Sequence, residues 1–293
     1  MEINKIKCGK FSFNVPNFDL KLTMFSGQTS QPPWKHKNDY YQELIFIEDK
    51  PCLIKVRQKN NHLEVKYETD TKVSPQDIKK TIKYIFDLEF NLDKFYFNFT
   101  QNDSIFSRIV EKYNGLRLFL AHNKYECIIS SITSANNSIS KWTRSILRIK
   151  EKLGRKYVFP SSEEMYYFPD PETVLENKDK LKYCGVGYRY KYIVETTKIL
   201  YENLSIDEVN KMEYDEAFET LLELPGVGPK VADCILLYGF RRYEAFPVDI
   251  WITRAIKDLF GVSKDIREFG QSKFGKYAGY AQLYLYQYIR HKK

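Results

Sequence analysis

The sequence predicts an α+β chain in which an antiparallel β domain precedes a mostly helical core. Short stretches of alternating apolar and polar residues dominate up to about residue 67, and apolar residues at helical spacing dominate after about residue 105. We therefore place an N-terminal β-rich domain at residues 1–104 and the helical core at residues 105–293. The length of 293 residues is enough to bury a sizeable core in one to three domains.

Three segments of the N-terminal part have the alternation or the dense apolar run of a β-strand. They are residues 11–15, 43–47 and 63–67. A helix is then predicted to begin at Ser74, because a capping serine is followed by Pro75 at the first helical position and by Asp77 three residues after the serine. We expect this helix to run through Ile85 and to pack on the sheet.

The remainder of the chain shows helical spacing interrupted by Gly, Pro or short polar turns. The predicted helices lie at about residues 105–113, 123–134, 138–152, 171–180, 188–202, 206–211, 214–222, 229–239, 249–259 and 276–290. This pattern predicts a bundle of short helices without repeats or heptads.

The amino-acid composition indicates which partners and which cellular compartment to expect. The chain has 46 Lys and Arg residues against 38 Asp and Glu residues, which gives a formal charge of +8, and 16% of its residues are aromatic. Basic and aromatic side chains together suit the binding of phosphates and stacked bases. The charge alone is equally explained by solubility. The five cysteines form no C-x-x-C pair and the four histidines lie far apart, so we expect reduced thiols and no bound metal. No stretch resembles a signal peptide or a membrane span, so we expect an intracellular protein without a membrane partner: cytoplasmic or nucleoid-associated in a bacterium or archaeon, nuclear in a eukaryote.

The most informative motif is a helix-hairpin-helix at about residues 214–238. Leu-Pro-Gly-Val-Gly-Pro-Lys-Val-Ala-Asp covers residues 224–233, with Gly226 and Gly228 in the hairpin and Lys230 in the first turn of the second helix. Glycines permit a tight turn and close approach of another molecule, and the free amides at the start of the helix suit a phosphate. Alone, the two glycines could equally form an ordinary interhelical turn.

Lys230 and Asp249 are the candidate catalytic residues. Near the positive end of a helix dipole an ammonium ion is disfavoured, which favours Lys230 as an amine nucleophile; the competing interpretation is a solvated surface lysine. Asp249, in Pro-Val-Asp nineteen positions later, is predicted to cap the helix that begins at Ile250. The same fixed carboxylate could stabilise positive charge on a sugar that loses its base.

Several motifs together resemble the 8-oxoguanine DNA glycosylase family of the helix-hairpin-helix glycosylases. Beyond the hairpin they are Gly-Leu-Arg-Leu at 115–118, Tyr-Glu-Cys at 125–127, Ser-Ala-Asn-Asn at 134–137, Gly-Val-Gly-Tyr-Arg at 185–189 and Tyr-Ala-Gly-Tyr-Ala-Gln at 277–282. The resemblance covers the chain from about residue 105 to its end and is weak before residue 105. It implies a bifunctional DNA glycosylase and AP lyase of base-excision repair that acts on duplex DNA containing 8-oxoguanine.

In this family resemblance each site residue has an implied role. Lys230 attacks the sugar C1′, expels the base and forms a Schiff base that permits strand cleavage by β-elimination, and Asp249 assists electrostatically. Gln282 reads the Watson-Crick edge of the extruded base, and Cys234 and Tyr286 sandwich it. Gly27 offers its carbonyl to the N7 hydrogen that distinguishes 8-oxoguanine from guanine. From the residues alone, Cys234 and Tyr286 are explained equally by core packing, and Gly27 by a turn.

The resemblance also implies a DNA-binding surface. Asn136 enters the gap left in the duplex, Tyr188 wedges beside the base opposite the lesion, and the other implied contacts come from Lys141, Arg189, Gly226 and Gly228. No cofactor is expected to be required, although the resemblance implies a monovalent cation at the hairpin carbonyls, and we expect a monomer. Lys141 stands where the family has an arginine, Arg290 or His291 is the nearest match to a second arginine, and Trp251 stands where a phosphate-contacting histidine is usual.

Two other functions stay open at this point. A non-catalytic helix-hairpin-helix DNA-binding module would need Gly226 and Gly228 but not Lys230 or Asp249. A monofunctional glycosylase for alkylated bases would not need a lysine at position 230.

Overall fold

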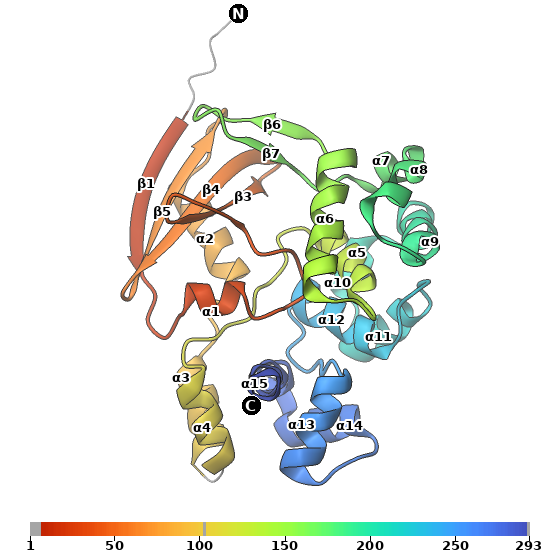
Figure 1. Cartoon of the computed structure of the whole chain (residues 1–293). Coiled ribbons are helices and arrows are strands. Elements are labelled where there is room, and N and C mark those ends of the chain that lie inside the picture. The colour runs from red at the N-terminus through yellow and green to blue at the C-terminus, as the bar shows by residue number, and fades with distance from the viewer. Residues whose placement is uncertain (1–6, 102–103, 292–293) are drawn as a thin grey trace, which may run out of the picture.

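The computed structural model describes residues 7–101 and 104–291. A five-stranded sheet lies on one side of the molecule, and helices make up most of the rest (Figure 1). The predicted α+β architecture is therefore confirmed. Among the described residues, no helix has both the length and the apolar character needed to span a membrane.

The N-terminal elements build the sheet and the helix that covers it. They are β1 (Lys7–Asn14), α1 (Leu20–Met24), β2 (Lys35–Lys37), β3 (Tyr40–Ile47), β4 (Lys50–Lys59), β5 (His62–Thr69) and α2 (Pro75–Ile85). The strand order is β1-β5-β4-β3-β2 and every pairing is antiparallel, with Val56 of β4 opposite both Tyr41 and Val65. This sheet includes all three predicted strand segments.

Helix α2 covers one face of this sheet, as its sequence predicts. Ser74 caps it by accepting from the N–H groups of Gln76 and Asp77, and Pro75 occupies the first turn. Apolar side chains at the core-facing spacing of α2 are fully buried against the sheet. They are Ile78, Ile82 and Ile85, packed with Ile45, Ile54, Val56 and Val65.

The helical part contains every helix predicted after residue 105, with the segment 171–180 divided in two. Its elements are α3 (Leu92–Thr100), α4 (Ser104–Lys112), α5 (Lys124–Ser134), α6 (Ile139–Leu153), α7 (Pro171–Glu176), α8 (Lys178–Leu181), η1 (Lys182–Cys184), α9 (Arg189–Glu202), α10 (Ile206–Lys211), α11 (Tyr214–Leu222), α12 (Pro229–Phe240), α13 (Ile250–Phe260), α14 (Ile266–Phe274), η2 (Gly275–Tyr277) and α15 (Ala278–Arg290). A small hairpin of β6 (Lys156–Val158) and β7 (Glu164–Tyr166) follows α6.

The sequence did not predict β2, β4, α1, α3, α14 or the β6–β7 hairpin. Helix α1 has five residues and each hairpin strand has three, which is too short for a periodic signal. Helix α3 contains Phe95, Tyr96 and Phe97, and aromatic residues favour strands. Helix α14 contains Gly270, a weak helix former, where a Cβ would lie 2.3 Å from the Phe246 ring.

The two parts of the chain are joined through buried side chains that matter for the site. Residues 26–31 run beside residues 117–120, where Gln28 bonds to main-chain groups of Arg117 and Phe119, and Gln31 donates to the Leu120 carbonyl at 2.8 Å. Helix α3 packs into the helical core through Phe95. The division of the domains at residue 104 stays a prediction.

Candidate active site

The helix-hairpin-helix is formed by α11, the turn at residues 223–228 and α12. Gly226 has a φ of +81°, and a Cβ there would lie 2.7 Å from Cβ of Tyr192 on α9. A side chain is therefore excluded both by backbone strain and by the neighbouring helix. Gly228 caps α12, and a Cβ at this position would meet nothing within 4 Å, so the main chain here is open to approach.

Lys230 projects from the first turn of α12 into a cavity. The residues after it bury the opposite face of the helix, since Val231, Ile235 and Leu236 are at most 5% exposed. The Lys230 amine donates to Oγ of Ser134 at 3.4 Å, and Ser134 donates its own proton to the Ser131 carbonyl at 2.7 Å. The nitrogen is thus held beside the loop that follows α5.

Asp249 is the N-cap of α13, as predicted. Its Oδ1 accepts from the N–H groups of Trp251 at 3.0 Å and Ile252 at 2.9 Å. These two bonds fix the direction of the carboxylate. In the described part of the chain, no ion pair joins Asp249 to Lys230, so the two groups remain available to a molecule between them.

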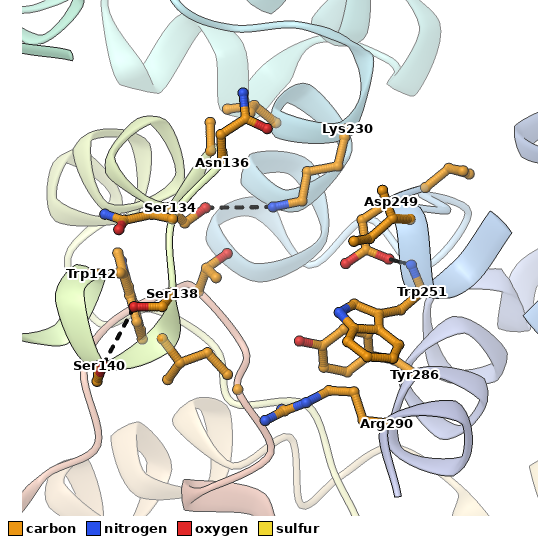
Figure 2. A pocket seen from close by; sticks show the side chains of 18 residues that line it. Ser134, Asn136, Ser138, Ser140, Trp142, Lys230, Asp249, Trp251, Tyr286 and Arg290 are labelled. Atoms are coloured by element: carbon orange, nitrogen blue, oxygen red, sulfur yellow. Dashed lines mark hydrogen bonds between the residues drawn. The ribbon is translucent and has the colours of Figure 1, made fainter. Parts of the chain in front are cut away.

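An open cavity of about 660 Å³ contains both groups (Figure 2). Figure 2 shows Asp249, Trp251, Tyr286 and Arg290 along one wall, facing Ser134 and Ser138 across the hollow. Both candidate catalytic residues therefore face the same solvent-accessible space. A flipped-out nucleotide is of the size that such a space can admit.

A smaller pocket of about 40 Å³ adjoins the cavity and shares Gly27, Thr29, Lys230, Asp249 and Tyr286 with it. The four residues predicted to recognise the base all line it. They are Gly27, Cys234, Gln282 and Tyr286. Its volume is close to the space of a single water molecule, so a purine requires the walls of this inner pocket to move apart.

Gln282 presents an unsatisfied acceptor in the inner pocket. Its Nε2 donates to the Pro247 carbonyl at 3.0 Å, while its Oε1 is buried and has no protein donor among the described residues. A buried acceptor without a partner costs free energy. A ligand that carries N–H donors on its edge would remove this cost, and a ligand with only acceptors would not.

Cys234 and Tyr286 complete the walls of the inner pocket. Burial raises the pKa of the Cys234 thiol, which keeps the sulfur uncharged. The guanidinium carbon of Arg290 lies 5.2 Å from the centroid of the Tyr286 ring. The two walls can therefore hold a flat, uncharged ring between a thiol and an aromatic face.

Gly27 reaches the inner pocket from the N-terminal domain. Its φ is +81°, and a Cβ would lie 2.8 Å from Nη1 of Arg290, 2.8 Å from Cδ1 of Ile139 and 3.7 Å from the Tyr286 ring. Gln287 of α15 also donates to the carbonyl of Ser26. The glycine is thus held between α6 and α15, which brings a main-chain group to the pocket.

Asn136 lies in the loop between α5 and α6 and lines the outer cavity. It is exposed and has a left-handed φ of 49°, which asparagine tolerates better than most residues. Arg189 is 7% exposed and donates to the carbonyls of Ala135 and Asn136. Its DNA contact stays a prediction, and the structure places its guanidinium under the Asn136 loop.

Four other predicted DNA-binding positions line neither cavity. Lys141 is exposed on α6. Tyr188 is 59% exposed, with the guanidinium of Arg189 at 4.4 Å from its ring centroid. Gly226 and Gly228 lie in the hairpin that leads into α12, just before Lys230. The roles of all four residues in DNA binding stay predictions.

Several cavity residues were not predicted as site residues. Ser134, Ser138, Ser140 and Trp142 form one wall, and Thr29, Ile250, Trp251 and Arg290 contribute elsewhere. Serine and isoleucine carry no distinctive signal in one sequence, whereas Trp251 and Arg290 were singled out through the family resemblance without an assigned role in the site. The arrangement as a whole places an amine, a fixed carboxylate and a pocket for a flat ring within one space, which suits substitution at a carbon bearing a heterocycle.

Comparison with known proteins agrees with this geometry. Residues 10–128 match the family model described as the N-terminal domain of 8-oxoguanine DNA glycosylase, and residues 129–272 match the HhH-GPD superfamily of base excision DNA repair proteins. A probable N-glycosylase/DNA lyase of Methanothermobacter thermautotrophicus is 42% identical over 94% of this chain and 95% of its own length. An N-glycosylase/DNA lyase of Arabidopsis thaliana is 30% identical over 91% of this chain and 76% of its own.

A solved structure has the same fold over its whole length. The 8-oxoguanine glycosylase/lyase of Clostridium acetobutylicum, in complex with double-stranded DNA containing cytosine opposite 8-oxoguanine, superposes with a TM-score of 0.84 at 30% identity, covering 99% of each chain. The match therefore includes the N-terminal sheet as well as the helical core. The chain belongs to the 8-oxoguanine DNA glycosylase family within the helix-hairpin-helix base excision repair superfamily.

Proposed function

We propose that this protein is a bifunctional DNA glycosylase and AP lyase that removes 8-oxoguanine from duplex DNA. The observation that carries the proposal is the placement of Lys230 and Asp249 on the same outer cavity and the same inner pocket. A monofunctional glycosylase has no use for an amine at this point, and a DNA-binding module has no use for the inner pocket.

The chemistry follows from the two groups. The Lys230 nitrogen forms a bond to C1′ while the bond from C1′ to the base breaks, and the departing base takes the electron pair and a proton. Positive charge that builds on the sugar is stabilised by the fixed carboxylate of Asp249. Loss of a proton from the nitrogen and opening of the C1′–O4′ bond give a Schiff base. Removal of a C2′ proton then breaks the C3′–O3′ bond and cuts the strand.

The inner pocket supports an oxidised guanine as the substrate base. The free acceptor of Gln282 matches the N1–H and N2–H donors of a guanine edge. We propose that the main-chain carbonyl of Gly27 accepts the N7–H that 8-oxoguanine has and guanine lacks. The crowding around Gly27 supports this proposal, because it fixes the backbone beside Tyr286.

The outer cavity supports extrusion of the nucleotide. Unstacking and unpairing a base costs a few kcal/mol, so side chains must fill the gap and hold the backbone. We propose that Asn136 fills the gap and that Arg189 keeps its loop in place through the carbonyls of Ala135 and Asn136. Lys141, Tyr188 and the amides near Gly228 would contact the rest of the duplex.

We also propose that carbonyl oxygens of the hairpin at residues 223–228 bind a monovalent cation. The tight turn at Gly226, closed by a bond from the Val227 N–H to the Leu224 carbonyl at 3.0 Å, supports this proposal. The cation would link these main-chain oxygens to a DNA phosphate. Exchange of potassium for a large organic cation should then weaken DNA binding.

Borohydride trapping on a duplex with one 8-oxoguanine tests the proposal. The wild type should give a covalent protein–DNA adduct, and Lys230→Gln should give none. Asp249→Asn should slow adduct formation by a factor on the order of 100, since a fixed electrostatic group typically contributes that much. Base release without an adduct would indicate a monofunctional enzyme, and binding without base release would indicate a non-catalytic module.

A further inference from the structure

Helix α6 carries a stripe of positive charge along its exposed face. Of its 15 residues, five are basic and one is acidic. Lys150 is buried and forms an ion pair with Glu126 at 3.1 Å. The other four basic residues are exposed and follow one another at intervals of three or four positions, so they share one face of the helix. We call these residues the α6 stripe: Lys141, Arg144, Arg148 and Lys152.

The charges of the α6 stripe are not neutralised by the protein. In the described part of the chain, no carboxylate forms an ion pair with any of the four residues. Exposed lysines on neighbouring elements do form such pairs. Lys156 of β6 pairs with Glu164 at 2.7 Å. Lys182 of η1 pairs with Asp179 at 2.7 Å. Like charges at this spacing on a helix repel one another, and an anionic partner would relieve the repulsion.

The α6 stripe begins at the outer cavity and passes the turn that presents Tyr188. Ser140, in the first turn of α6, lines the cavity. Further along α6, Ser145 donates to the Gly185 carbonyl at 3.0 Å, and a Cβ on Gly185 would lie 3.4 Å from Nη1 of Arg148. Gly185 stands three positions before Tyr188, which is exposed. Arg148 therefore lies next to a turn whose aromatic ring is one of the predicted DNA contacts.

The α6 stripe is long enough to meet several phosphates of one DNA strand. Lys141 and Lys152 are 11 positions apart (152 − 141), which corresponds to about 16 Å along a helix. The phosphates of one strand of B-DNA advance by about 3.4 Å each along the duplex axis, so this length corresponds to about four or five phosphates. Figure 1 shows α6 running from the centre of the molecule toward the β6–β7 hairpin. The stripe thus leads from the cavity toward DNA beyond the lesion.

We infer that Arg144, Arg148 and Lys152 bind phosphates of the strand opposite the lesion, on one side of the base opposite the lesion. The inference rests on the proposed glycosylase function, in which Lys141 and Tyr188 contact the duplex, and it extends that surface along α6. Contacts to phosphates carry no sequence information. The α6 stripe therefore contributes affinity and fixes the orientation of the duplex, while recognition of 8-oxoguanine belongs to the inner pocket.

The salt dependence of DNA binding tests the inference. The probe is a duplex with a tetrahydrofuran abasic analogue, which cannot react with Lys230. The α6 triple variant combines Arg144→Gln, Arg148→Gln and Lys152→Gln. It should bind this duplex more weakly than the wild type by on the order of 10-fold at low salt. The slope of log Kd against log salt should decrease by about 2–3, because each phosphate contact contributes about 0.9 to the slope. An unchanged slope would overturn the inference.

A second triple variant controls for the loss of three charges. It combines Lys10→Gln, Lys72→Gln and Lys80→Gln, which replace exposed lysines of β1, of the segment before α2 and of α2 that line neither the outer cavity nor the inner pocket. This variant should keep the slope of the wild type. Equal losses in the two triple variants would show that only net charge matters and would overturn the inference. Thermal melting checks that both variants fold, because surface substitutions of this kind change stability little.

Uncharged methylphosphonate linkages identify the strand that the α6 stripe binds. They replace the phosphates on one flank of the base opposite the analogue, and then those on the other flank. On one flank they should weaken binding by the wild type more than binding by the α6 triple variant, which has already lost these contacts. The same linkages in the strand that carries the analogue should weaken binding by both proteins equally. Equal losses in both proteins on each flank of the opposite strand would overturn the inference.

Borohydride trapping of the wild type separates this inference from the proposed function. If the wild type gives an adduct with 8-oxoguanine duplex while the binding tests fail, the inference alone is wrong. If the binding tests succeed and no adduct forms, the catalytic proposal is wrong and the α6 stripe remains a DNA-binding surface.

Discussion

Substitution of Gly27 by alanine should lower the stability of the protein only slightly but reduce the rate of base excision strongly. The φ of +81° costs an L-residue about 1–2 kcal/mol, partly offset by about 0.4–1 kcal/mol of lost freedom in the unfolded chain. The new methyl group would also lie 2.8 Å from the ends of Arg290 and Ile139, which are flexible enough to move. We therefore expect a net loss of about 1 kcal/mol, or about 2 °C in the melting temperature.

The effect on catalysis should be larger than the effect on stability. The methyl group would lie 3.7 Å from the Tyr286 ring, at the inner pocket, and would therefore displace a base bound there. A displacement of about 1 Å in a bound substrate can lower the rate about 100-fold. Single-turnover excision of 8-oxoguanine measures this effect. Gly261→Ala is the matched control, since Gly261 has a φ of +71° and its Cβ would meet nothing within 4 Å. The reasoning is refuted if Gly27→Ala keeps the wild-type rate, or if both variants lose rate equally.

Three further predictions concern Ser134 and Arg189, which support the site, and Glu126, a buried residue of α5 paired with Lys150. Ser134→Ala removes the acceptor at 3.4 Å from the Lys230 nitrogen. It should lower the rate of borohydride trapping by on the order of 10-fold and leave the melting temperature unchanged. An unchanged trapping rate would contradict a role of Ser134 in positioning the Lys230 amine. Arg189→Met leaves the main-chain carbonyls of the Asn136 loop without their donor and should lower the free energy of unfolding by about 1–3 kcal/mol, as measured by urea denaturation. The variant should also bind a duplex with an abasic analogue more weakly. If neither stability nor affinity decreases, Arg189 does not hold the Asn136 loop in place. Burial raises the pKa of the Glu126 carboxyl to about 7, so the free energy of unfolding is greatest below the unfolded pKa and decreases as the pH rises through 7. Glu126→Gln should remove up to about 1.4 kcal/mol per pH unit of this decrease. An identical dependence of stability on pH in the wild type and the variant would contradict the prediction.

Local features of the site could be predicted because their determinants are close in sequence. The N-cap role of Asp249 depends on the two residues that follow it, and the hairpin depends on Gly226 and its neighbours within a few positions. Three strands of the antiparallel sheet were likewise predicted from alternation or a dense apolar run within the strand. Where a short element lacks such periodicity, as in α1, no prediction was made.

Features that depend on distant packing could not be predicted. Gly27 and Arg290 are 263 positions apart (290 − 27), and nothing near either residue indicates that they meet. Arg189 was predicted as a DNA contact from the family resemblance, and nothing in the sequence indicated that its guanidinium donates to the main-chain carbonyls of Ala135 and Asn136. Such carbonyls leave no trace in the sequence, because every residue has one.

The central claim is that the Lys230 nitrogen bonds to the anomeric carbon of the extruded nucleotide. Peptide mapping by mass spectrometry of the borohydride-trapped adduct tests it most directly. The account predicts that the sugar is attached to the peptide containing Lys230. Attachment at another lysine or at the N-terminal amine, with Lys230 unmodified, would contradict it.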